Sequence, residues 1–133
     1  MAVRQASNRR DQLLHSAATL FSRQGYHGTS MQDLAKDLGI LRGSLYAHIA
    51  SKEDILFEIV DAGADRFISR LEEVVLSDLA PGEKIEKAIL GHVMTVAEHL
   101  DAATVFLNDW RHLSPEGMAL IQKKRDRYEA LVR

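Results

Sequence analysis

The sequence predicts an all-α fold, in which a three-helix head is followed by an antiparallel bundle of longer helices. Every recurring apolar pattern in the chain has the three- to four-residue spacing of a helix. Residues that cap helix N-termini stand just before several of these patterns. No segment alternates apolar and polar residues as a half-buried strand does. The clearest breaks in the pattern predict two parts, residues 1–50 and 51–133.

The composition is that of a globular protein with one core. The 133 residues are 46% hydrophobic, and the absence of cysteine excludes a disulfide framework and a thiolate metal site. No apolar run approaches the ~20 residues of a membrane span. The N-terminus also lacks the apolar segment of a signal peptide, so we expect a cytoplasmic protein.

The net charge of -2 conceals a difference between the two ends of the chain. Residues 1–52 carry 7 Lys and Arg against 3 Asp and Glu, whereas residues 53–133 carry 10 against 16. A basic head on an acidic body favours contact with nucleic-acid phosphates at one end only, although a difference of this size also arises by chance.

The head is predicted to contain one helix of ordinary length and two short ones. We expect the first helix to begin after Asn8, which can act as its N-cap, and to end at Gly25. Two short helices follow, at about residues 31–38 and 41–48, and Ser30 can cap the first of them.

The residues at and before the turn between the short helices predict a helix-turn-helix. Gly39 can take the left-handed backbone conformation that a sharp turn between helices requires. Ala35 is small enough for the second short helix to approach closely. Ordinary helix pairs with a glycine between them show the same pattern, so the spacing alone leaves both interpretations open.

The body is predicted to contain four helices. The longest is capped by Ser51 and runs for roughly 37 Å to Val75. A fifth helix follows the break at residues 80–82, and a sixth begins at about Asp101. Ser, Pro and Glu at residues 114–116 are typical of the N-cap and first turn of a seventh helix.

The residues on both sides of the helix-turn-helix resemble a known family. Gly-Tyr-His-Gly-Thr-Ser precedes it at residues 25–30, and Gly-Ser-Leu-Tyr-Ala-His-Ile-Ala-Ser-Lys-Glu-Asp occupies residues 43–54. From Asn8 to about Leu56, the chain resembles the N-terminal domain of TetR-type transcriptional repressors. The resemblance implies a ligand-responsive regulator and not an enzyme, with the second short helix in the major groove of double-stranded operator DNA.

The resemblance assigns DNA contacts to Thr29, Arg42, Gly43, Ser44, Tyr46, His48 and Lys52. Arg42 can donate two hydrogen bonds to a guanine, and Gly43 lets the helix approach the bases. Ser44 is expected at a base edge or a phosphate, and the other side chains at phosphates. The alternative is that Tyr46 only packs and Lys52 is solvated. Leu41 and Ala47 depart from the family pattern, so neither helix capping nor DNA contact is predicted at these two positions.

The resemblance also implies a pocket in the body for a small, mostly apolar effector. The residues expected to bind the effector are Phe67, Leu71, His92, Val96, Phe106, Trp110 and Arg111. Most of them are better explained as core residues. His92 and Trp110 are stronger candidates, because each joins an apolar ring to a polar atom that needs a partner. We expect Trp110 and Phe106 on the pocket wall and Arg111 near its rim.

Two segments of the body, residues 106–115 and 125–131, resemble a subgroup of these repressors that governs fatty-acid or sterol catabolism and responds to acyl-CoA thioesters. The basic run at residues 123–127 can meet CoA phosphates, but such a run is more often a solvated helix face.

Metal binding and catalysis are not predicted. His92 and His99 are seven residues apart, or roughly 10 Å along a helix, too far to share one ion. The chain has no Gly-rich phosphate loop and no nucleophile elbow. We therefore expect no cofactor, no metal and no catalytic residue.

Family members usually continue for two or more helices that pair with a second subunit, whereas this sequence ends inside a helix at Arg133. We expect a fragment or a shortened protein, and homodimerisation through helices that the chain does not contain. Two other classes stay open. One is an interaction module whose head binds a protein or coats DNA without reading its sequence, and the other is a ligand carrier with a vestigial head.

Overall fold

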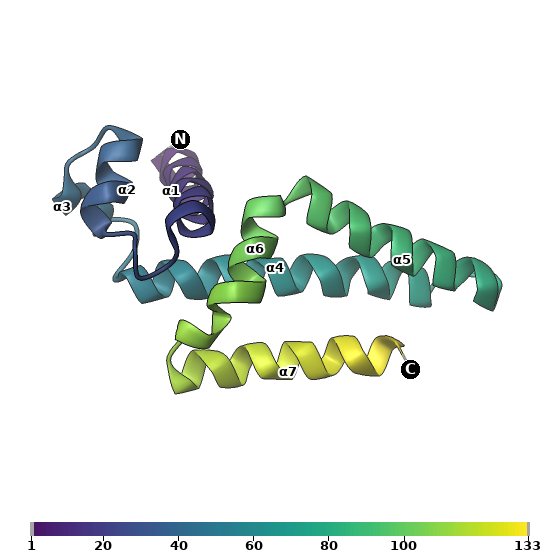
Figure 1. Cartoon of the computed structure of the whole chain (residues 1–133). Coiled ribbons are helices and arrows are strands. Elements are labelled where there is room, and N and C mark those ends of the chain that lie inside the picture. The colour runs from purple at the N-terminus through teal and green to yellow at the C-terminus, as the bar shows by residue number, and fades with distance from the viewer. Residues whose placement is uncertain (1, 133) are drawn as a thin grey trace.

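The structure is a computed structural model that describes residues 2–132. Within this range the chain forms seven α-helices and one short 3-10 helix and no strand, as the sequence predicts. Figure 1 shows a long central helix, α4 (Lys52–Val75), with the head at one end and the other body helices along its length. Among the described helices, none is both long and apolar enough to cross a membrane.

The head consists of α1 (Ala2–Gln24), α2 (Met31–Leu38) and α3 (Arg42–Leu45). The side chains that hold these helices together are almost fully buried: Leu13, Ala17, Phe21, Leu34, Ala35 and Leu45. Burying one leucine or phenylalanine side chain contributes about 1.5–3 kcal/mol. This cluster therefore fixes the angle between the two short helices.

The turns of the head follow the predicted capping pattern. The Ser30 hydroxyl accepts a hydrogen bond from the Asp33 N–H at 3.0 Å, and the Asp33 carboxylate accepts one from the Ser30 N–H at 2.9 Å. Gly25 follows the end of α1 and Gly39 the end of α2, with φ angles of 82° and 69°. Because a side chain is strained at such angles, these two turns require glycine.

The first helix is longer than predicted. α1 begins at Ala2, so Asn8 lies inside the helix and is not its N-cap. The residues before Asn8 include Ala, Arg and Gln, which have high helix propensity and let the helix extend towards the N-terminus.

The second short helix is shorter than predicted, with four residues in α3 where eight were expected. Its N-cap is Leu41, whose side chain offers no hydrogen bond to the first turn. Beyond Leu45 the chain continues as a turn, in which the His48 N–H donates to the Leu45 carbonyl at 2.9 Å.

The body adds three helices to α4: α5 (Pro81–Glu98), α6 (Leu100–Asp109) and α7 (Pro115–Val132). Figure 1 shows α5 and α7 on opposite sides of α4, with α6 crossing it. The predicted caps are present. The Ser51 hydroxyl accepts from the Asp54 N–H at 3.2 Å, and the Ser114 hydroxyl accepts from the Gly117 N–H at 3.1 Å.

One apolar core runs from the head into the body. Ile55 and Leu56 in the first turn of α4 are fully buried and belong to the same cluster as Leu13 of α1, Val105 of α6 and Ile121 of α7. Because interiors are close-packed, a displacement of α6 or α7 is felt by the head.

α5 is buried less deeply than its sequence pattern suggests. Ile85, Ile89 and Val93 are between 57% and 62% exposed, and within this helix Thr95 is the buried residue. The apolar periodicity therefore predicts the helix correctly but not the burial of that stripe.

Candidate nucleic-acid interface and effector cavity

The exposed surface of the head is built on α3. Leu45 is fully buried and anchors the helix, whereas Arg42, Gly43 and Ser44 are exposed. Arg42 is the first residue of α3, and Tyr46 at its C-cap is 47% exposed. The structure thus places four of the seven predicted DNA-contact residues in exposed positions on and next to this short helix.

Gly43 is not required by the fold. A methyl group added there meets no protein atom within 4 Å, and its backbone is not among the described glycines with positive φ. The glycine instead leaves the backbone of α3 uncovered, so that another molecule can approach it closely.

The turn after α3 is held by Arg10, which was not among the residues predicted for the site. Nη1 of Arg10 donates to the His48 carbonyl at 2.9 Å, and the same guanidinium pairs with Glu58 of α4. The His48 side chain is half-buried. Arg10 therefore joins α1, the turn and α4. The available signal was the pair of arginines at positions 9 and 10 in the basic head.

Thr29 differs from the prediction. Its side chain is 1% exposed, and its hydroxyl donates to the Gly25 carbonyl at 2.9 Å. The end of a helix leaves carbonyls without a helical partner, and this hydroxyl satisfies one of them. The predicted phosphate contact through this hydroxyl is therefore corrected, because the group is turned into the loop between α1 and α2.

Lys52 lies apart from the α3 surface. Its ammonium is 4.1 Å from the centroid of the Tyr26 ring, at the junction between head and body. Burial lowers the pKa of Lys52 below its usual value, although the charges of Asp109 and Asp33 oppose the change.

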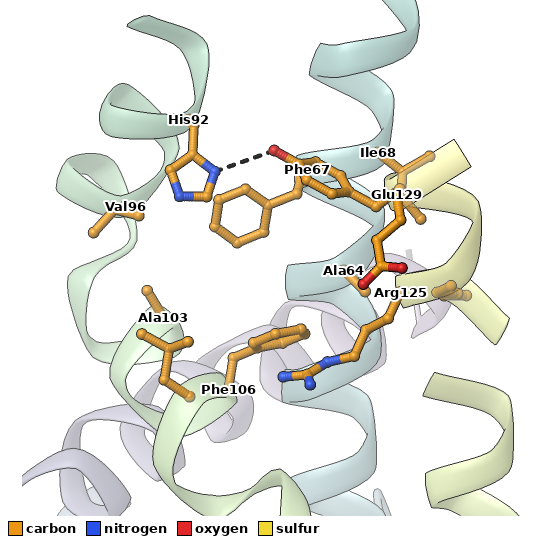
Figure 2. Close-up of a pocket in the computed structure, with 12 residues that line it drawn as sticks. Ala64, Phe67, Ile68, His92, Val96, Ala103, Phe106, Arg125 and Glu129 are labelled. Atoms are coloured by element: carbon orange, nitrogen blue, oxygen red, sulfur yellow. Dashed lines mark hydrogen bonds between the residues drawn. The ribbon is translucent and has the colours of Figure 1, made fainter. Parts of the chain in front are cut away.

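A cavity of about 250 Å³ lies among α4, α5, α6 and α7 (Figure 2). Its lining is Ala64, Phe67, Ile68, His92, Val96, Ala103, Phe106, Leu107, Lys124, Arg125, Tyr128 and Glu129. Four of the predicted effector residues are therefore brought together: Phe67, His92, Val96 and Phe106. Ala64 and Ile68 share the α4 stripe with Phe67, which was the available signal for them.

The other three predicted effector residues lie outside this lining. Leu71 borders a neighbouring apolar groove of about 620 Å³ instead. Trp110 lies in the 3-10 helix η1 (Trp110–His112) after α6, so its predicted place on the cavity wall is wrong. Arg111 is exposed, and its Nε donates to the Asn108 carbonyl at 3.1 Å. For Trp110 and Arg111 the cause is the change from α-helix to 3-10 helix, which alters the direction of successive side chains.

Polar groups lie at two ends of the cavity in Figure 2. At one end, Nδ1 of His92 and the Tyr128 hydroxyl form a hydrogen bond of 3.3 Å, and the Phe67 ring lies 4.9 Å from the His92 ring. Burial raises the pKa of Tyr128. At the other end, the guanidinium carbon of Arg125 is 5.2 Å from the centroid of Phe106 and 4.0 Å from that of Trp110.

The basic run on α7 is not a uniform solvated face. Nζ of Lys124 lies 2.5 Å from Asp61 and 2.7 Å from Asp65, both on α4, and Arg127 pairs with Glu72. Burial alone lowers the pKa of Lys124, but the hydrogen bonds and charges of the two aspartates raise it above its usual value. These ion pairs hold α7 against α4.

α6 connects the cavity to the head. Asp101, in its first turn, accepts hydrogen bonds from the hydroxyls of Thr19 and Ser22 on α1, at 3.1 and 3.0 Å. Ala103 and Phe106 of the same helix line the cavity. One short helix therefore contacts both the cavity and the first helix of the head. Within the described residues, no group of three or more His, Asp or Glu side chains is placed to hold a metal ion.

Comparison with protein families gives two matches. Residues 13–59 match the model described as bacterial regulatory proteins, tetR family, and residues 78–133 match the model described as tetracyclin repressor-like, C-terminal domain. The first match contains the helix-turn-helix, and the second contains α5, α6 and α7.

Similar proteins include transcriptional regulators. The chain is 30% identical over 112 residues to the HTH-type transcriptional repressor KstR2 of Mycobacterium tuberculosis. The matched region covers 84% of this chain and 56% of that protein. The chain thus spans about half the length of the curated relatives it matches.

Solved structures show the same architecture. The TetR family regulator PfmR from Thermus thermophilus superposes with a TM-score of 0.85 at 33% identity, covering 90% of this chain and 65% of that one. AibR, solved in complex with isovaleryl coenzyme A and operator DNA, superposes with a TM-score of 0.82 at 28% identity, covering 92% of this chain and 67% of that one.

Proposed function

The chain belongs to the TetR family of bacterial regulatory proteins, and from this membership we propose that it is a cytoplasmic transcriptional repressor released from operator DNA by a small effector. The observation that carries the proposal is the surface of α3. A fully buried Leu45 holds the helix while Arg42, Gly43 and Ser44 are exposed at its start. A helix anchored in this way can enter a major groove without losing its own core contacts.

The exposed residues suit different parts of DNA. Arg42 reads a guanine through two hydrogen bonds, and each such pair discriminates against the wrong base by about 1–3 kcal/mol. Gly43 lets the α3 backbone approach the base edges. Ser44, Tyr46 and the turn at His48 contact the sugar-phosphate backbone, which sets orientation without reading sequence.

The protein acts as a homodimer on an operator with two half-sites. Two-fold pairing places the two copies of α3 about 34–36 Å apart, which is one turn of DNA. The half-sites are then read by equivalent residues of each subunit, and the operator is an inverted repeat.

The effector occupies the cavity among α4, α5, α6 and α7. The AibR complex with isovaleryl coenzyme A supports an acyl-CoA as a candidate effector. A ligand that pushes against Phe106 moves α6, and Asp101 carries this movement to Thr19 and Ser22 of α1. The ligand lowers operator affinity to the extent that it binds the displaced arrangement more tightly.

Selection of bound duplexes from random DNA, using the purified protein, tests this proposal. We expect enrichment of one inverted repeat, and loss of preference at one position of each half-site when Arg42 is replaced by alanine. Equal binding to all duplexes contradicts sequence reading and favours an interaction module. Absence of any salt-dependent DNA binding favours a ligand carrier.

A further inference from the structure

Arg125 is the cation of α7 that lines the cavity without a partner of opposite charge among the described residues. Lys124 also lines the cavity, but it is held by Asp61 and Asp65. Arg127 is held by Glu72 and does not line it. In residues 2–132, no hydrogen bond or ion pair of the Arg125 guanidinium is formed.

Two aromatic rings hold this guanidinium in place. Its central carbon is 4.0 Å from the Trp110 centroid and 5.2 Å from the Phe106 centroid. Contact with the rings uses none of the N–H groups as hydrogen-bond donors to a carbonyl or carboxylate oxygen, so the five donors of the guanidinium stay available. Arg125 is therefore pre-positioned for a planar anion such as a carboxylate, or for a phosphate.

Apart from Lys124, Glu129 and the His92–Tyr128 pair, the rest of the lining is apolar, and the cavity is small. Ala64, Phe67, Ile68 and Val96 supply most of the surface between Arg125 and the His92–Tyr128 hydrogen bond. A protein cavity of about 150 Å³ holds benzene, so the volume of about 250 Å³ accommodates roughly ten non-hydrogen atoms.

We propose that this cavity binds an acyl chain of about ten non-hydrogen atoms whose anionic group is held by Arg125. The inference rests on the proposed function, since it names the chemistry of the ligand in the same cavity. The anionic group is the carboxylate of a free acid, or a phosphate of its coenzyme A ester, in which case the pantetheine arm between the acyl group and the phosphate also lies along the cavity. Trp110 is a built-in reporter, because it is the single tryptophan of the chain and contacts the guanidinium that the ligand engages.

The test compares three ligands of one chain length. Octanoate carries a carboxylate, octanamide is its neutral counterpart of the same size, and octanoyl-CoA is the thioester. Binding to the 133-residue protein is measured without DNA, by Trp110 emission and by calorimetry. Calorimetry is needed because replacing Arg125, which contacts Trp110, alters the Trp110 emission even when no ligand is bound. We expect octanoate or octanoyl-CoA to bind at least about tenfold more tightly than octanamide, as a charge-assisted hydrogen bond allows.

Three variants assign that preference to Arg125. Arg125→Met keeps most of the apolar stem and removes the charge, so it reduces the affinity for the anionic ligand to that for octanamide. Lys123→Met removes the same charge from an exposed position on α7 outside the lining, and leaves the preference unchanged. Glu129→Gln removes the carboxylate that lines the cavity one helical turn from Arg125, and strengthens binding of the anion. Circular dichroism melts confirm that each variant folds.

The outcomes separate this inference from the repressor function. Stronger binding of octanoate supports a free acid, and stronger binding of octanoyl-CoA supports the thioester, provided that Arg125→Met abolishes the advantage. Equal affinity for octanoate, octanoyl-CoA and octanamide, an advantage that survives in Arg125→Met, or no binding of any of the three overturns the inference. A ligand that binds through Arg125 but leaves operator affinity unchanged contradicts the proposed release mechanism while the anion site stands.

Discussion

Among individual side chains, Arg42 and Lys52 have different surroundings although both are basic residues at helix starts. Arg42 is exposed on α3, whereas Lys52 lies over the Tyr26 ring at the junction of head and body. A guanidinium free to enter the groove can read a base, and an ammonium at the edge of the head can only add charge.

Replacement of Arg42 by alanine is therefore expected to relax sequence preference, at a cost of about 1–3 kcal/mol on the cognate duplex. Lys52→Ala is expected to weaken binding to all duplexes alike and to reduce the slope of affinity against salt by about one. Titrations on cognate and scrambled duplexes at several salt concentrations distinguish the two. The assignment is reversed if Lys52→Ala changes specificity and Arg42→Ala does not.

Gly43→Ala distinguishes a glycine needed for folding from a glycine needed for binding DNA. The added methyl group meets no protein atom, and alanine favours a helix over glycine by about 0.8–1.0 kcal/mol, so the free energy of unfolding is expected to rise slightly. DNA affinity is expected to fall, because the methyl group stands where the bases approach. Urea unfolding and operator titration measure the two effects.

A buried glycine provides the control for this substitution. At Gly117 an added methyl carbon comes within 3.3 Å of Phe57 and of Ser114, so crowding opposes the gain in helix propensity. Gly117→Ala is therefore not expected to raise stability. Unchanged operator affinity in Gly43→Ala contradicts a close approach of α3 to DNA.

Among the helices, α2 shows how far a short element depends on its caps. It has eight residues, which is too few for stability in isolation, and both ends are closed by specific groups, the capping box at Ser30 and Asp33 and the left-handed Gly39. The buried residues Leu34 and Ala35 then attach the capped helix to the head.

Ser30→Ala removes the hydroxyl that accepts the Asp33 N–H, and is expected to lower the free energy of unfolding by about 1 kcal/mol. Ser44→Ala is the matched control, since Ser44 is exposed and is not a cap, and its effect is expected to stay below about 0.5 kcal/mol. Urea denaturation of both variants decides the matter. Equal losses of stability show that the capping box contributes nothing specific.

Considered as one body, the molecule connects its two candidate sites through a continuous core. The cluster around Leu13, Ile55 and Val105 joins α1, α4 and α6, and Asp101 adds two hydrogen bonds between α6 and α1. We therefore expect a ligand among α4 to α7 to act on the head through packed helices and not through a loose hinge.

Asp101→Ala is expected to reduce the effect of the ligand on operator affinity, because it removes both hydrogen bonds from α6 to α1. Ligand affinity in the absence of DNA is expected to change by no more than about twofold, since Asp101 does not line the cavity. Operator titrations with and without ligand give the coupling, which is typically about 1–3 kcal/mol. Thr104→Ala is the control, since Thr104 is a half-buried residue of α6 whose hydroxyl donates to the Leu100 carbonyl of the same helix, and equal coupling in the two variants contradicts this route.

Local sequence determined the helices and most of their ends. Ser30, Ser51 and Ser114 cap the helices that they were predicted to cap, and Gly25 and Gly39 make the predicted turns. Each of these caps and turns has its hydrogen-bond partners three or four residues away, so they can be predicted from the sequence alone. The exposure of Arg42 followed in the same way, from its place at the start of a short helix.

Only the tertiary structure decided where the long side chains go. Lys52 lies over Tyr26, and Trp110 lies beneath Arg125 and outside the cavity wall. The position of each of these side chains depends on how helices distant in sequence pack together. A side chain at the end of a helix can point in more than one direction, and the neighbouring helix determines which. Arg125 is the clearest case. Its charge could be predicted from the sequence, but the two rings that hold it at the cavity come from α6 and from the 3-10 helix that follows α6.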